Sequence, residues 1–102
     1  MTHDIESIID GVRRQIPEVE VVQMHKTHEA DDDGLWWFRL PGHQRDIQIE
    51  SSTYDCPFLI EHDDMKSSSE ALTGHSIAEV VEIVSRYLLA LREERAESGK
   101  GE

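Results

Sequence analysis

Histidine and aspartate side chains occur together in two short segments that could bind a metal ion. His25 and His28 are separated by two residues, and His62 is followed directly by Asp63. Imidazole and carboxylate groups together suit zinc or iron, and these four groups would meet if both segments ended at one edge of a sheet. Their spacing matches no established metal motif. Exposed loop side chains are the competing interpretation, and we expect no metal or other cofactor.

The residues that could catalyse a reaction give little support for an enzyme. The one cysteine, Cys56, precedes Pro57 in an acidic chain, where a nucleophilic thiolate is disfavoured. Glu61 and Asp63 could share a face as a catalytic carboxylate pair. In a chain with 22 acidic residues, such a pair is expected by chance and does not indicate a catalytic site. The glycines form no phosphate-binding loop. We therefore expect a binding protein with no catalytic residues.

Two adjacent tryptophans, Trp36 and Trp37, give the clearest indication of a binding surface. Neighbouring side chains of a strand point to opposite faces, so one tryptophan must lie on the polar face of the sheet unless a loop of this chain covers it. The sequence leaves open which one. Exposed tryptophan beside arginine is typical of interaction hot spots, and acidic residues next to it would guide a basic partner. The predicted partner-binding residues are Trp36, Trp37, Arg39, Asp31, Asp32 and Asp33.

The charge of the chain narrows the choice of partner. There are 22 Asp and Glu against 10 Lys and Arg, for a net charge of −12, and residues 1–33 alone hold nine acidic and three basic residues, net −6. Such a chain repels phosphate backbones and anionic membranes. The sequence thus excludes nucleic acid and membrane and favours another protein, a basic one, as partner. The alternative is that the acidity serves solubility alone.

The periodicity of the apolar residues predicts the elements that position these side chains. Spacings of three and four predict helices over 4–15 and from 77 to about 93, the second beginning at the capping box Ser76–Glu79. Short β-branched and aromatic segments with turn residues between them predict an antiparallel meander. Its four strands are expected at 18–25, 35–40, 45–50 and 57–61. The predicted fold is α+β, with both helices on one face of a four-stranded sheet (αββββα).

Length and composition predict the number of domains and the cellular location of the chain. The 102 residues suffice for a single core, which we expect to span 1–95, with a disordered polar tail at 96–102. The longest apolar runs are four and five residues, too short for a membrane span or a signal peptide. A single cysteine gives no argument for an oxidising compartment. We expect a soluble cytoplasmic protein.

Element order, size and acidity over residues 4–93 resemble the small immunity proteins that bacteria encode beside toxic effectors, and more loosely the acidic chaperones of secretion systems. The resemblance implies inhibition without catalysis, by occlusion of a basic toxin, and assigns no residue a role. A homodimer that pairs two open sheet faces would hide the tryptophan in the absence of another partner. The rival hypothesis is a small-ligand or metal-binding domain that uses His and Asp residues at the ends of the sheet.

Overall fold

The computed structural model describes residues 3–24, 34–62 and 71–100, with side chains as far as Glu94. The elements are α1 (Asp4–Gln15), β1 (Glu20–Gln23), β2 (Leu35–Arg39), β3 (Asp46–Glu50), β4 (Phe58–His62), β5 (Leu72–Gly74) and α2 (Ile77–Lys100). The strands form one antiparallel sheet in the order β1-β2-β3-β4-β5. The α+β class and the two terminal helices are confirmed, whereas the predicted number of four strands was wrong.

Helix α1 has the bounds that its apolar spacing predicts. Ile5, Ile8 and Val12 lie on one stripe and are buried. At its start the backbone N–H of His3 donates to Glu6 Oε2 at 3.2 Å, which satisfies one of the donors that a helix start leaves without a partner. Two residues after its end comes Pro17, which prevents continuation. The helix is thus specified locally.

Strand β5 is the element that the sequence pattern did not predict. It is three residues long, Leu-Thr-Gly, which is too short to show a period of two. Pairing with β4 creates it, with Gly74 opposite Phe58 and Leu72 opposite Ile60. A Cβ on Gly74 would lie 2.4 Å from Val80 Cγ2, so glycine allows the strand to pass close under α2. Gly74 therefore belongs to the sheet.

Helix α2 begins at the predicted capping box. The backbone N–H of Glu79 donates to Ser76 Oγ at 3.1 Å, and the N–H of His75 donates to Glu79 Oε1 at 3.1 Å. The helix continues to Lys100, beyond the predicted end near residue 93. Arg45 reaches Glu94 at 2.9 Å, an ion pair near the point where the helix leaves the sheet. None of the described helices could cross a membrane.

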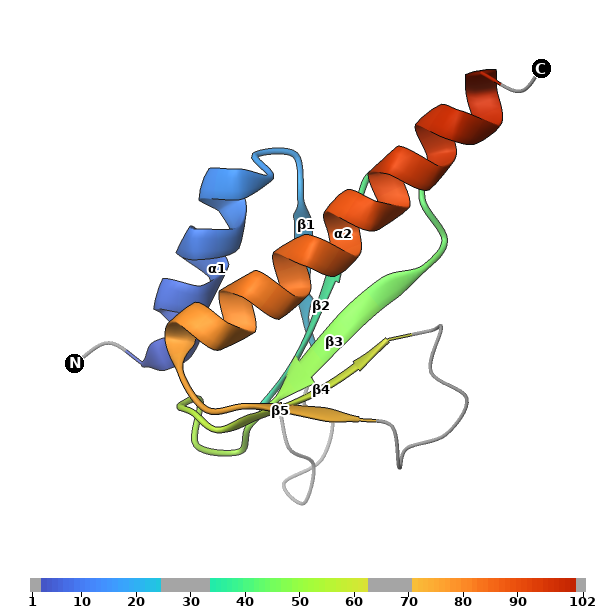
Figure 1. Cartoon of the computed structure of the whole chain (residues 1–102). Helices are drawn as coiled ribbons and strands as arrows, with labels where there is room; N and C mark the ends of the chain where they lie inside the picture. Colours follow the sequence, from blue (N-terminus) through green and yellow to red (C-terminus); the bar gives the residue numbers. More distant parts are fainter. Residues whose placement is uncertain (1–2, 25–33, 63–70, 101–102) are drawn as a thin grey trace.

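Both helices cover the same face of the sheet (Figure 1). Val80, Val84 and Leu88 of α2 are fully buried, as the apolar stripe predicts, and pack with α1 and the inward side chains of β2, β3 and β4. A Cβ on Gly11 would lie 2.8 Å from Val81 Cγ2, so the two helices approach closely there. The core is thus a single layer between helices and sheet, and the opposite face of the sheet carries neither helix.

Candidate partner-binding surface

The structure decides which of the two tryptophans belongs to the core. Trp36 is 3% exposed and makes edge contacts with Tyr54 and Phe58, at ring-centroid distances of 5.1 and 6.2 Å. Tyr54 adopts a φ of 69°, a left-handed conformation that is uncommon outside glycine. Trp37, the next residue, is half-buried on the opposite face of the sheet. Trp37 is therefore the tryptophan that a partner could reach.

We call the face without helices the open face, defined by the outward side chains of the five strands. Strand register places them in three rows, because directly opposed residues of antiparallel strands point to the same side. One row reads Val22, Trp37, Gln48 and Glu61. A second row reads Leu35, Glu50, Leu59 and Thr73, and a third reads Glu20, Arg39 and Asp46.

Two exposed apolar side chains share the open face with Trp37. Its cross-strand neighbour Val22 is 48% exposed, and Leu59 on β4 is 36% exposed. Val22, Trp37, Arg39 and Asp46 line a hollow of about 200 Å³. A smaller one of about 80 Å³ shares Asp46 with it and is also lined by Glu61. The surface is therefore hollowed beside the ring of Trp37, and a side chain of a partner could enter this hollow.

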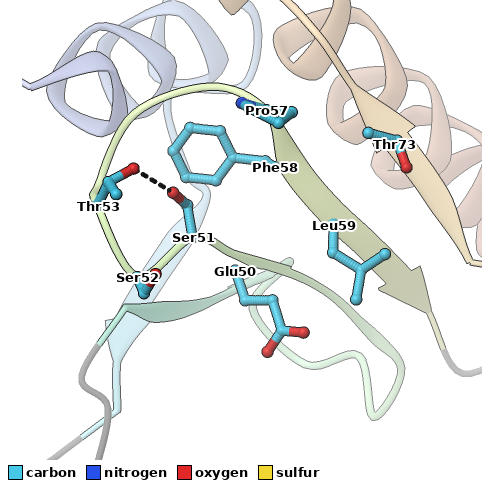
Figure 2. A pocket seen from close by; sticks show the side chains of 8 residues that line it. All are labelled: Glu50, Ser51, Ser52, Thr53, Pro57, Phe58, Leu59 and Thr73. Atoms are coloured by element: carbon cyan, nitrogen blue, oxygen red, sulfur yellow. Dashed lines mark hydrogen bonds between the residues drawn. The ribbon is translucent and has the colours of Figure 1, made fainter.

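A larger hollow of about 530 Å³ lies where the open face meets the turn between β3 and β4 (Figure 2). Glu50, Leu59 and Thr73 of the open face form one part of its lining, and residues 51–53 of the turn form another. The Ser51 and Thr53 hydroxyl oxygens are 3.1 Å apart, and Ser51 Oγ also donates to the Asp55 carbonyl oxygen at 2.6 Å. These bonds fix the turn, so the hollow has a preorganised wall.

Negative charge predominates on the open face. Among its described side chains, Glu20, Asp46, Glu50 and Glu61 carry four carboxylates, and Arg39 carries one guanidinium, for a local net charge of −3. Arg39 Nε lies 3.5 Å from Glu20 Oε1, so the guanidinium is already beside a carboxylate of its own chain. An approaching cation meets a negative surface around Trp37.

The predicted charged and metal-binding residues are placed only in part. Asp31, Asp32 and Asp33 lie outside the described residues, and so do His25, His28 and Asp63 of the alternative metal site. His62 is described: its ring stacks on Tyr87 with centroids 4.3 Å apart and an interplanar angle of 23°. Within the ranges that the structure describes, no three His, Cys, Asp or Glu side chains are grouped closely enough to hold a metal ion.

Cys56 is placed where a thiol stays protonated. Its pKa is raised to about 11, mainly by burial and in smaller part by the neighbouring Asp4 carboxylate. The backbone N–H of Cys56 donates to Asp4 Oδ2 at 3.0 Å, so the segment is tied to the start of α1. A thiol with this pKa holds very little thiolate near pH 7, and a nucleophilic role has no support.

Most residues of the open face were not among the partner-binding residues that the sequence predicted. Val22 and Leu59 contribute exposed apolar area, and Glu61 contributes a carboxylate in the same row as Trp37. The alternation of side chains along the strand could have predicted that Leu59 faces outward, because it lies between the core residues Phe58 and Ile60. Strand register was the missing information, since it alone brings Val22 and Glu61 into one row with Trp37.

Comparisons of this chain with protein-family models, with curated proteins and with solved structures find no match.

Proposed function

We propose that this chain is a non-catalytic protein-binding module whose open face docks a basic segment of another protein, as an immunity-type inhibitor occludes a toxin or effector. The observation that carries the proposal is Trp37, held half-buried between apolar Val22 and polar Gln48 on a face with a local charge of −3. The chemistry of this face is that of an aromatic anchor within an acidic surround.

The two kinds of side chain would have separate roles in binding. An aromatic ring on a rigid strand loses little conformational entropy on binding and buries a large area, so Trp37 supplies affinity. The carboxylates of Asp46, Glu50 and Glu61 attract a cationic segment and raise the rate of association. The hollows lined by Glu50 and by Asp46 offer space for the partner's side chains.

A basic protein fits this face better than a second copy of the chain does. Pairing two open faces would bring a local charge of −3 against another of −3. Like charges opposed across an interface disfavour association, and removing carboxylates from water without a partner adds a further cost. A segment rich in arginine or lysine would instead neutralise these carboxylates.

The test begins with capture of partners from an extract of the native host on the immobilised chain. Proteins retained by wild type and lost with Trp37→Ala are the candidates, and Leu72→Ala is the matched control, since Leu72 is 44% exposed but belongs to the helix-covered side of the sheet. A retained protein is then purified. The proposal requires it to be basic and to bind with an affinity that falls as salt increases.

Binding kinetics of the purified pair separate the two roles. Glu61→Gln is expected to slow association and weaken its salt dependence, whereas Trp37→Ala is expected to accelerate dissociation, with a loss of about 2 kcal/mol or more. Glu93→Gln, at an exposed position of α2, controls for the change in net charge. Binding that is unaffected by Trp37→Ala and Glu61→Gln would refute the proposal.

A further inference from the structure

A second surface lies on the helices, where a groove of about 640 Å³ runs between α1 and α2. All of its lining residues come from these two helices and none from a strand. The close approach of Gly11 to Val81 forms its floor, and the half-buried side chains of Ile77 and Leu89 extend the apolar floor along α2. This groove shares no residue with the open face.

The charges around the groove cancel, although the whole chain carries −12. On α1, Arg14 Nη2 lies 2.8 Å from Asp10 Oδ2, and on α2, Arg86 Nε lies 3.6 Å from Glu82 Oε1. All four side chains are more than 60% exposed. Exposed pairs four residues apart on a helix contribute only about 0.3–0.5 kcal/mol each, so they can be exchanged for other partners at little cost.

We propose that the groove between α1 and α2 is a self-association surface, and that its occupant is the helix pair of a second copy of this chain. Charge complementarity supports this choice of occupant. At physiological ionic strength charges are screened beyond about 8 Å, so the groups at the contact matter more than the distant net charge. The groove offers two cations and two anions to an identical surface.

Twofold symmetry makes this arrangement self-complementary. In a closed dimer, a contact from residue i of one copy to residue j of the other occurs twice. Arg14 of one copy can therefore face Glu82 of the other, and the same pairing repeats across the axis. The apolar floor at Val81 and Leu89 would be removed from water by the same contact. A partner surface of one charge sign fits the groove less well, because it would bring like charge against either the two arginines or the two carboxylates.

Sedimentation equilibrium of the full chain over a concentration series up to about 1 mM tests the proposal. The average mass is expected to rise from that of the 11.7 kDa chain toward twice that value. Ala78→Glu, at an exposed groove position, should weaken the dimer at least about tenfold because it places an unpaired charge in the contact. Ala90→Glu, also exposed on α2 but outside the groove lining, is the matched control and should leave the dimer unchanged.

A charge exchange gives a second, independent measurement. Arg14→Glu with Arg86→Glu makes the groove acidic, and Asp10→Arg with Glu82→Arg makes it basic, so each double variant should be monomeric and a mixture of both should form a one-to-one dimer. Circular dichroism establishes that all variants are folded. A wild-type chain that stays monomeric throughout, or a dimer that Ala78→Glu leaves unaffected, would overturn the proposal. If Trp37→Ala disrupted that dimer instead, the open face would be the contact.

Discussion

At the scale of single residues, two neighbouring tryptophans have different roles: Trp36 belongs to the core, and Trp37 lies on the open face. The alternation of a strand requires that one point inward and one outward, and the sequence predicted that much. It could not say which, because Leu-Trp-Trp-Phe is apolar on both sides. In the structure Trp36 lies opposite the core residue Ile49 and contacts the ring of Tyr54, whereas Trp37 lies opposite Gln48.

This assignment predicts losses of stability of different size for the two tryptophans. Trp36→Ala removes a ring that is 3% exposed and should lower the free energy of unfolding by about 3–5 kcal/mol. Trp37→Ala removes a half-buried ring from the open face and should cost about 1 kcal/mol or less. Urea unfolding followed by circular dichroism measures both. Similar losses for the two variants would mean that Trp37 is also part of the core.

At the scale of elements, the start of α1 and the turn between β3 and β4 are joined by reciprocal hydrogen bonds. The N–H of Asp4 donates to Asp55 Oδ1 at 2.8 Å, and Asp4 Oδ2 accepts from the N–H of Cys56. The bond from Asp4 is the main reason that the pKa of Asp55 lies below its ordinary value of 3.8, with a smaller contribution from His3. The contact holds the helix to the sheet at the end of the molecule where the larger hollow lies.

The lowered pKa gives the contact a pH dependence with a definite sign. A carboxyl whose pKa is lowered by folding adds stability above its unfolded pKa, and this stability is lost as the pH falls through the folded value. Asp55→Asn should therefore be less stable than wild type above pH 3.8, with a difference that shrinks at lower pH. Unfolding titrations at several pH values measure the difference. Glu93→Gln, a substitution of an exposed carboxylate of α2, is the matched control for the loss of one carboxylate.

Helices and strands could be predicted from the sequence where they are specified by residues close together in the chain. The bounds of α1, the start of α2 at Ser76 and four of the strands followed from periodicity and capping. Strand β5 could not be predicted, because three residues become a strand only through their pairing with β4. The candidate surface was predicted through Trp37 and Arg39, but Val22 and Glu61 join it only through strand register.

At the scale of the whole molecule, the net charge of −12 is distributed unevenly over the two described surfaces. The open face carries a local −3, whereas the four charges around the groove between α1 and α2 cancel. The described ion pairs have exposed side chains and contribute little each. Repulsion among carboxylates is therefore the larger electrostatic effect on stability.

This balance predicts that added salt stabilises the protein. Raising the sodium chloride concentration shortens the Debye length from about 30 Å at 0.01 M to about 8 Å at 0.15 M, which screens the repulsion between carboxylates. The melting temperature should rise over this range, as followed by circular dichroism at low protein concentration, where self-association does not contribute. A melting temperature that falls with salt would show that the ion pairs outweigh the repulsion.

The contact between Gly11 and Val81 has a consequence for the order of folding. Each strand of the meander pairs with the next strand along the chain, so the sheet can form by successive closures of short loops. The contact between the two helices, in contrast, joins positions 70 residues apart. Closing so long a loop costs conformational entropy, and this cost must be met before the packing of the helices can stabilise the folded chain. We therefore expect the sheet to form first and to present its apolar face to the helices. In that order of events, the two helices complete the core together in the last step of folding.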